Sequence, residues 1–350
     1  MNNVSAMFGL KSSKRVVDSS LLLLKQVSKI PWLSTPSRTQ VDICPAQLTK
    51  PEVMSVLSRS SVLMGRPDRV EETLDAIQQA GAASLHVISD FDMTLTRFAH
   101  NGKRVPTTHN ILDSRLLVDE ECGKKMRELL NTYYPIEIDA SRTVEEKLPF
   151  MVEWWTKVHH LLVEQKIRKD LLAPAVRESN SVVSMLRDGC GVFFDRLAQR
   201  DVPVLIFSGG VGDVLEEVIR QHGVSGPNVH VIANYMDFDH AGVLRAFKGD
   251  LIHTFNKREG ALSHVARFPE LRARRSVLLL GDSLGDLNMA AGVPEPRRLL
   301  TVGFLNDQVD ARRESYVNSF DVVVLAEDDT MDVPNAILRF VMSSGDEKGN

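Results

Sequence analysis

The chain has 350 residues, which allows two domains or one domain with a large insertion. Apolar residues make up 43% and charged residues 25%, so a sizeable core can be buried and wholesale disorder is excluded. With 42 Lys plus Arg against 46 Asp plus Glu, the net charge of −4 argues against a nucleic acid polymer as partner. The 3 cysteines exclude a disulfide scaffold, and no apolar run approaches the roughly 20 residues of a membrane span.

The N-terminal segment differs in composition from the rest of the chain. Residues 1–50 are rich in lysine and serine, and their only acidic residues are Asp18 and Asp42. This bias is typical of a mitochondrial transit peptide, but arginine is scarce and no clear cleavage signal is visible. We therefore expect a basic, poorly ordered tail and a cytoplasmic protein, with a mitochondrial location as the alternative. Residues 343–350 are expected to form a short C-terminal tail.

Short apolar runs alternate with helical patterns along most of the chain. Helical periodicity is found, for example, over residues 67–81, 211–222 and 285–291. Continuous apolar strands without polar alternation indicate a parallel sheet that is covered on both faces. The predicted fold class is therefore α/β, with a Rossmann-like parallel sheet. The expected strands are residues 85–91, 202–208, 228–234, 276–281, 299–305 and 321–325.

The connection between the first two predicted strands is far longer than a crossover requires. It spans roughly a hundred residues, whereas a dozen or so suffice. Its patterns are helical, over residues 119–133, 143–164 and 170–199. We predict a core of residues 51–100 and 200–342, and a helical cap domain of residues 101–199 inserted after the first catalytic strand. A later segment, 235–257, has two turn signals that indicate an antiparallel hairpin.

Two carboxylates follow the first predicted strand, in the sequence Asp90-Phe91-Asp92. Ligands collect at the carboxyl ends of strands in open α/β sheets. One such aspartate can attack phosphorus as a nucleophile, and the other can hold a proton for a leaving oxygen. Taken alone the pattern is weak, because an acidic loop or an Asx-turn is its commoner meaning.

Other chemistry-bearing residues follow later strands. The hydroxyl of Ser208 and the backbone of Gly209 can hold phosphate oxygens, although a glycine turn needs no ligand. Asp282 and Asp286 suit Mg²⁺, a hard cation that prefers oxygen ligands, although helix capping is an alternative role. Lys257 follows the predicted hairpin and can offset negative charge on a phosphate.

Together these residues give the order D-x-D-x-T, then Ser, then Lys, then G-D-x-x-x-D. This order resembles the haloacid dehalogenase-like phosphatases. The segments "SDFDMTLTRF", "TVEEKLPFMVEWWTK", "FKGDLIHTFNK" and "LLLGDSLGDLNMA" are similar to the pyrimidine 5′-nucleotidase family, also called cytosolic 5′-nucleotidase III. Within this family the chain looks most like the 7-methylguanosine phosphate-specific branch. The resemblance runs from about residue 87 to about residue 338.

The resemblance implies a role for each matching residue. Asp90 would be the nucleophile that forms an aspartyl-phosphate, and Asp92 would be the general acid and base. The residues that would hold the cofactor Mg²⁺ are Asp90, Asp92 through its backbone carbonyl, and Asp282. Asp286 would not bind the ion itself but would orient a water molecule or Lys257 next to it. The phosphate would be held by Ser208, Gly209 and Lys257. The family usually has alanine at the position of Gly209, so we expect a slightly looser loop here.

Base recognition is expected on the helical insertion. Glu137 matches an acidic residue that contacts the base in the family, and a carboxylate can accept hydrogen bonds from guanine or from cytosine. Trp155 matches a position that stacks on the base. Methylation at N7 gives guanine a positive charge, and indole is the best aromatic face for a cation. This favours 7-methyl-GMP as a substrate, whereas the neighbouring Trp154 is expected to pack inside the cap.

The function predicted from these residues is that of a Mg²⁺-dependent 5′-nucleotidase. Its expected substrates are the nucleoside 5′-monophosphates 7-methyl-GMP and CMP, with UMP as a further candidate, and a monomer is expected. Two alternatives remain open at this point. One is a small-metabolite phosphatase of the same superfamily, and the other is a non-catalytic module that binds 7-methylguanosine nucleotides.

Overall fold

The computed structural model describes residues 47–343, apart from residues 115, 140, 183–184, 259–267, 269–270, 272, 294, 296 and 327–328. The predicted basic tail therefore lies outside the described residues as far as residue 46, and with it the segment on which the mitochondrial alternative depends. The same holds for residues 344–350 of the predicted C-terminal tail.

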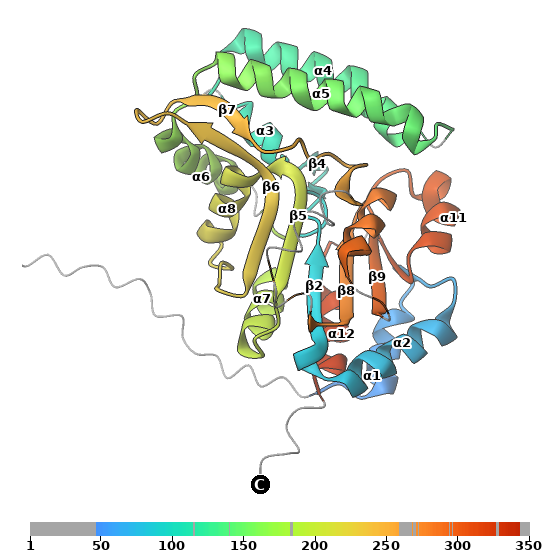
Figure 1. Ribbon diagram of the computed structural model, residues 1–350. Helices are drawn as coiled ribbons and strands as arrows, with labels where there is room; N and C mark the ends of the chain where they lie inside the picture. The colour runs from blue at the N-terminus through green and yellow to red at the C-terminus, as the bar shows by residue number, and fades with distance from the viewer. Residues whose placement is uncertain are drawn as a thin grey trace, which may run out of the picture. The chain divides into compact units, whose positions relative to one another are not determined.

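One 8-stranded sheet forms the centre of the described chain, in the order β1-β10-β9-β8-β2-β5-β6-β7 (Figure 1). The inner strands pair in parallel, and only β1 and β7 pair antiparallel, at the two edges. The predicted parallel sheet is therefore confirmed, and β6 with β7 is the predicted hairpin. The strands are β1 (Val62–Leu63), β2 (Leu85–Ser89), β5 (Val204–Val211), β6 (Val229–Phe238), β7 (Leu244–Lys248), β8 (Ser276–Gly281), β9 (Arg298–Leu305) and β10 (Val322–Leu325).

Helices cover the sheet on both faces, as its unbroken apolar strands require. On β2, Val87 belongs to one buried cluster and the next residue, Ile88, to the other. The first cluster includes Leu74 and Leu338, and the second includes Tyr316. The helices are α1 (Lys50–Leu57), α2 (Pro67–Ala80), α3 (Thr108–Leu112), α4 (Glu120–Ile138), α5 (Val144–Glu164), α6 (Leu172–Val182), α7 (Cys190–Gln199), α8 (Gly212–Gln221), α11 (Val309–Ser319) and α12 (Asp332–Val341).

The long insertion between β2 and β5 is helical, as predicted. Its helices α4 and α5 pack against each other, and Figure 1 shows the pair beyond the carboxyl ends of the strands. The helix α7 instead packs against α12, although the predicted boundary at residue 199 assigns it to the cap. The division into core and cap at residues 101 and 199 therefore stays a prediction.

Two local details differ from the sequence-based expectation. A short hairpin of β3 (Ala99–His100) and β4 (Lys103–Arg104) follows β2, where no strand was expected. The segment expected as a helix over 285–291 is a 3₁₀ helix, η4 (Leu284–Gly292). Strands of two residues are too short to leave a periodic pattern, and α- and 3₁₀-helices share nearly the same pattern over two turns.

Two glycines end β5 in different surroundings. A Cβ atom on Gly210 would lie 2.1 Å from Thr108 Oγ1 and 2.8 Å from Asp92 Oδ2, so no larger residue fits there. A Cβ atom on Gly209 would lie 3.4 Å from its nearest neighbour, the Cα atom of His253, which is ordinary van der Waals distance. Only Gly210 is therefore required by close packing.

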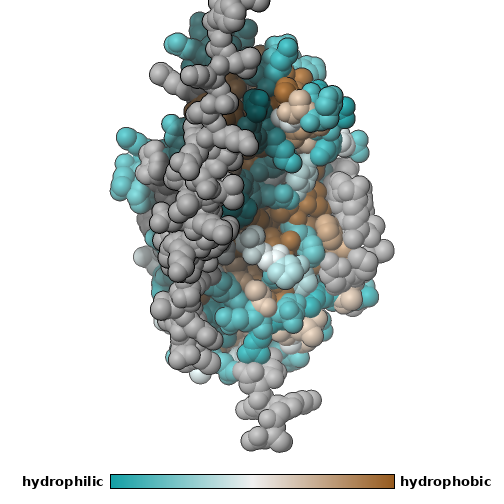
Figure 2. All heavy atoms as spheres, turned by 90° about the vertical axis from the view of Figure 1, so that its left-hand side faces the viewer, coloured by the Kyte–Doolittle hydropathy of each residue, from teal (hydrophilic) through white to brown (hydrophobic). Residues whose placement is uncertain are grey.

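None of the described helices is both long enough and apolar enough to cross a membrane. On the face that Figure 2 shows, hydrophilic side chains alternate with smaller apolar patches. Large apolar side chains that are exposed are spread over several elements, such as Val152 of α5 and Leu284 of η4.

The glycine pair gives a first prediction. Gly209→Ala should keep activity and raise the free energy of unfolding by about 0.4–1 kcal/mol, because alanine restricts the unfolded chain and has room in the folded one. Gly210→Ala should lower both stability and activity, because it displaces Thr108 and Asp92. Thermal unfolding and phosphate release measure the two effects. Equal destabilisation by both changes would contradict the packing argument.

A buried histidine on β2 predicts loss of stability in acid. His86 is 1% exposed, and its burial lowers its pKa to about 4. Below about pH 6.5 the unfolded chain binds a proton at this position that the folded chain excludes, so the contribution of His86 to stability falls as the pH drops toward 4, by on the order of 3 kcal/mol. His86→Leu should remove this contribution, so the variant should gain stability relative to the unchanged protein as the pH of urea unfolding is lowered from 6.5 to 4. The same change at the exposed His240 is the control and should leave the pH dependence as it is.

Candidate active site

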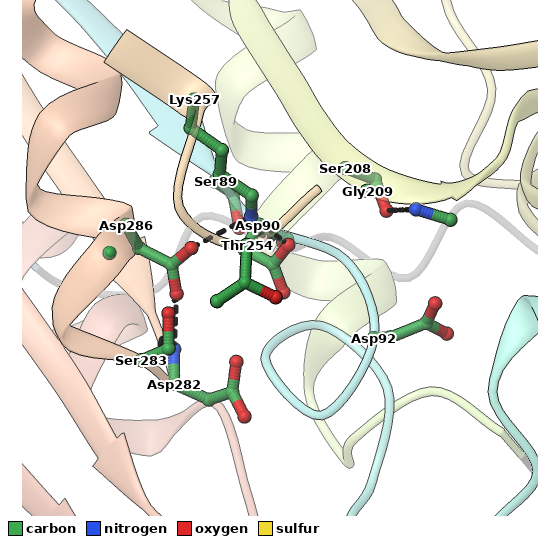
Figure 3. Close-up of polar contacts among 12 residues, drawn as sticks. Ser89, Asp90, Asp92, Ser208, Gly209, Thr254, Lys257, Asp282, Ser283 and Asp286 are labelled. Carbon is green, nitrogen blue, oxygen red and sulfur yellow. Dashed lines mark hydrogen bonds and ion pairs between the residues drawn. The ribbon is translucent and has the colours of Figure 1, made fainter. Parts of the chain in front are cut away.

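Three neighbouring strands bring the predicted phosphate chemistry to one edge of the sheet. β2 lies between β8 and β5. The strands that follow β2 in the sequence, β5 to β7, lie on one side of it, and the later strands β8 to β10 lie on the other side. Such a switch in strand order opens a crevice at the carboxyl ends of the strands. Asp90 and Asp282 directly follow β2 and β8, and Ser208 lies in the last half of β5. The structure thus brings together residues that are far apart in the sequence (Figure 3).

A buried lysine joins two of the predicted carboxylates. Lys257 Nζ lies 2.5 Å from Asp90 Oδ1 and 2.7 Å from Asp286 Oδ1. The three side chains are between 1% and 8% exposed. Burial opposes the charged form of Lys257, but the charges of Asp286 and Asp90 raise its pKa above the usual range. The ammonium group therefore stays charged and lies where it can offset negative charge next to Asp90.

The two aspartates of the loop after β8, Asp282 and Asp286, have different hydrogen-bond partners. Asp286 Oδ2 accepts hydrogen bonds from the backbone N–H groups of Asp282, at 3.0 Å, and Ser283, at 2.9 Å. With Lys257 on its other oxygen, Asp286 is fully engaged by the protein. No described residue donates a hydrogen bond to the carboxylate of Asp282. Burial and the negative charges of Asp90 and Asp286 raise the pKa of Asp282 well above its usual range.

These carboxylates fit a divalent cation. One oxygen of each of Asp90, Asp282 and Asp286 lies within 4.8 Å of the others. Lys257 alone pairs with this cluster among the described residues, so negative charge remains in excess. A hard dication with oxygen ligands matches both the donor atoms and the excess charge. Because Asp286 is already occupied, Asp90 and Asp282 are the side chains that could hold the ion directly.

Asp92 lies apart from the lysine cluster, on the side of Ser208 and Gly209 (Figure 3). Its Oδ1 accepts from the backbone N–H of Thr108 at 3.0 Å, and its Oδ2 from the hydroxyl of Thr108 at 2.8 Å. Burial raises its pKa to about 6, and the hydrogen bonds from Thr108 oppose the rise. An acid with this pKa can both give and take a proton near neutrality.

The irregular end of β5, residues 208–210, is called the Ser208 turn below and is held by its neighbours. The Ser208 hydroxyl oxygen accepts from the backbone N–H of Gly210 at 3.0 Å. Asn234 on β6 donates to the carbonyls of Gly209 and Ile252, both at 2.8 Å. This side chain therefore ties the turn to the segment that leads to Lys257.

Thr108 and Asn234 were missed by the sequence-based analysis. Each contributes through a contact with a residue that is distant in the sequence, and neither leaves a local pattern. Thr108 is the first residue of α3 and follows the capping residue Thr107, so its place in the sequence has an ordinary meaning as the start of a helix.

The two residues predicted to bind the base reach the core from the cap helices. Trp155 of α5 donates from its indole Nε1 to the carbonyl of Gly209 at 2.9 Å. Glu137 of α4 accepts from the Thr254 hydroxyl at 2.5 Å, and burial raises the pKa of Glu137. Trp154 stacks on Tyr133 inside the cap, with ring centroids 6.0 Å apart. The predicted base-binding side chains thus adjoin the Ser208 turn and the Lys257 segment.

The sequence of this chain is similar to known proteins along most of its length. Residues 93–342 match the model of the family "Pyrimidine 5′-nucleotidase (UMPH-1)". The chain is 52% identical over 294 residues, 84% of its length and 97% of the relative's, to the 7-methylguanosine phosphate-specific 5′-nucleotidase of Homo sapiens. It is 33% identical over 287 residues to the enzyme of that name from Drosophila melanogaster, covering 81% of this chain and 88% of that one.

A solved structure gives the same result in three dimensions. The crystal structure of cytosolic 5′-nucleotidase IIIB bound to cytidine superposes with a TM-score of 0.75 at 31% identity. The match covers 85% of this chain and 98% of that one. The family expected from the sequence motifs is therefore confirmed. The chain is thus an enzyme that belongs to the pyrimidine 5′-nucleotidase family.

Proposed function

We propose that this 5′-nucleotidase is Mg²⁺-dependent and hydrolyses 7-methyl-GMP and CMP, with UMP as a further candidate, through an aspartyl-phosphate. The observation that carries the proposal is the buried contact of Lys257 with Asp90 and Asp286 at the end of β2. A carboxylate at this position, with an adjacent cation, suits attack on a phosphate that already carries negative charge.

The reaction divides into two displacements at phosphorus. In the first, a carboxylate oxygen of Asp90 bonds to phosphorus, the bond to the nucleoside O5′ breaks, and Asp92 gives its proton to that oxygen. In the second, Asp92 takes a proton from water, whose oxygen bonds to phosphorus and releases Asp90. The raised pKa of Asp92, about 6, supports its use in both directions.

Other residues hold the phosphate while these bonds change. Lys257 offsets negative charge that develops beside Asp90, and the Ser208 hydroxyl and Gly209 backbone bind phosphate oxygens. The side chains of Asp90 and Asp282 and the backbone carbonyl of Asp92 would hold Mg²⁺. When bound, this ion supplies positive charge that stabilises the transferring phosphoryl group.

Base selection is assigned to Glu137 and Trp155. The names of the relatives and the indole at residue 155 both support 7-methyl-GMP, and the cytidine in the related structure supports CMP. Membership in a family of nucleotidases argues against both a small-metabolite phosphatase and a non-catalytic binding module. A cytoplasmic location and a monomeric state stay predictions.

Phosphate release from 7-methyl-GMP, CMP, UMP, GMP and AMP tests the proposal, with serine phosphate and a sugar phosphate as non-nucleotide controls. We expect preference for the first two nucleotides and loss of activity with a chelator, restored by added Mg²⁺. Faster release from serine phosphate or sugar phosphate would contradict the proposed substrate class.

Asp90→Asn should abolish turnover, because an amide is a far weaker nucleophile than a carboxylate. Nucleotide binding should persist, because the amide is nearly isosteric and Ser208 and Lys257 remain. Isothermal titration measures binding, and phosphate release measures turnover. Turnover close to that of the unchanged protein would exclude Asp90 as the nucleophile.

Trp155→Ala should weaken 7-methyl-GMP more than CMP, by about tenfold in KM, because only the methylated base is cationic and cation–π contacts reach roughly 2 kcal/mol when desolvated. Trp155→Phe keeps an aromatic face but loses the hydrogen bond to Gly209, so it should keep most of the preference. Trp154→Ala is the matched control and should lower stability without changing the substrate ratio. Equal losses for both nucleotides in Trp155→Ala would contradict stacking on a cationic base.

A further inference from the structure

The chain leaves the core after the catalytic aspartates and returns beside the same segment. Leu186 forms an antiparallel bridge with Thr96. The backbone N–H of Arg187 donates to the carbonyl of Leu95 at 3.0 Å, and that of Arg97 donates to Met185 at 2.8 Å. The returning segment is therefore fixed against the turn that begins at Asp92.

Arg187 extends from the returning segment into this turn. Its guanidinium Nε donates to the carbonyl of Thr94 at 2.8 Å, and its Nη2 donates to the carbonyl of Met93 at 3.0 Å. The side chain is 2% exposed, and Nη1 pairs with Asp329 at 3.2 Å. Hydrogen bonds from a buried cation are stronger than those between neutral groups.

A second side chain holds the same carbonyl. Asn306, directly after β9, donates from Nδ2 to the carbonyl of Met93 at 2.9 Å. Its Oδ1 accepts from Arg187 Nη2 at 2.8 Å. The carbonyl of Met93 thus accepts hydrogen bonds from both side chains, which also bond to each other.

The turn needs this support because its backbone is strained. Met93 has a φ of +67°, in the left-handed region that side chains other than glycine rarely adopt. Met93 directly follows Asp92, so a relaxed backbone at Met93 would turn the Asp92 side chain away from its place beside Thr108. Strained residues persist only where surrounding contacts fix them.

We propose that Arg187, with Asn306, is a positioning residue that holds Asp92 where it can exchange protons with the substrate. This inference rests on the proposed function, in which Asp92 is the general acid. In its described contacts, Arg187 touches neither Asp90 nor the residues assigned to the phosphate. Its loss should therefore affect the first displacement in proportion to how much the leaving group needs a proton, whereas the second displacement, in which Asp92 takes a proton from water, is the same for every substrate.

Arg97 offers a matched control. It is buried like Arg187 and pairs with the same Asp329, at 2.5 Å, and also with Asp188. Its side chain makes no described contact with the carbonyls of Met93 or Thr94. A purely structural role for the arginine pair would make the two residues equivalent, whereas a positioning role would separate them.

The experiment compares two substrates on the full chain with Mg²⁺. CMP releases an alkoxide that needs a proton, whereas p-nitrophenyl phosphate releases a stable phenolate that does not. Arg187→Met should lower kcat/KM for CMP, which reports only the steps up to release of the nucleoside, by about 10- to 100-fold, since misplacement by about 1 Å costs roughly 100-fold. The loss for p-nitrophenyl phosphate should be several-fold smaller, and Arg187→Lys should restore part of the CMP activity.

Further variants make the outcome decisive. Asn306→Ala removes one donor but keeps the buried cation, so it tests the same selective loss if Arg187→Met does not fold. Arg97→Met should lower the melting temperature without changing the ratio of the two substrates. Equal losses for both substrates in Arg187→Met and Asn306→Ala, or a selective loss in Arg97→Met, would overturn the positioning role.

Asp92→Asn separates this inference from the proposed function. It should show the largest difference between the two substrates. If Asp92→Asn shows that difference and the Arg187 and Asn306 variants do not, the positioning role is wrong and the proposed function stands. If Asp92→Asn lowers kcat/KM equally for both substrates, Asp92 is not the proton donor and both proposals fall.

Discussion

The contact between Lys257 and two aspartates is the constraint on which the site depends. A buried ammonium and a buried carboxylate each lose much of their hydration, and close pairing must compensate for that loss. Lys257 is 167 residues from Asp90 in the sequence and 29 from Asp286. Its two ion pairs therefore form only when three separate segments of the chain lie side by side. The parallel strands achieve this meeting, because β8 and β2 are neighbours and end at the same edge. Removing one partner would leave an uncompensated charge in the core.

The cap helices and the phosphate chemistry are coupled through direct hydrogen bonds. Trp155 bonds to Gly209, beside the Ser208 hydroxyl, and Glu137 bonds to Thr254, just before Lys257. Side chains assigned to the base therefore also contact segments assigned to the phosphate. Substrate binding between them would have to replace or accommodate these contacts. This links recognition of the base to the arrangement of the reacting groups, and closure of such an insertion excludes water.

Much of this architecture follows from the sequence alone. Strands buried on both faces give continuous apolar runs, and those at 276–281 and 299–305 match β8 and β9 to within one residue. Polar residues directly after such runs, as at Asp90 and Asp282, are expected at the carboxyl edge of the sheet whatever the rest of the chain does. The segments around these residues also resemble the pyrimidine 5′-nucleotidase family, to which the comparisons assign the chain.

Only the tertiary structure decided which side chains support those residues. Thr108 binds Asp92, Asn234 joins Gly209 to Ile252, and Arg187 holds the carbonyl of Met93. Each acts across a long sequence separation through one hydrogen bond or two, and such contacts leave neither a period nor a motif in the chain. Local sequence determines where strands and helices form, because backbone propensity and burial act on neighbouring residues. The partners of a buried polar group are determined by which segments the fold brings within about 3 Å of it.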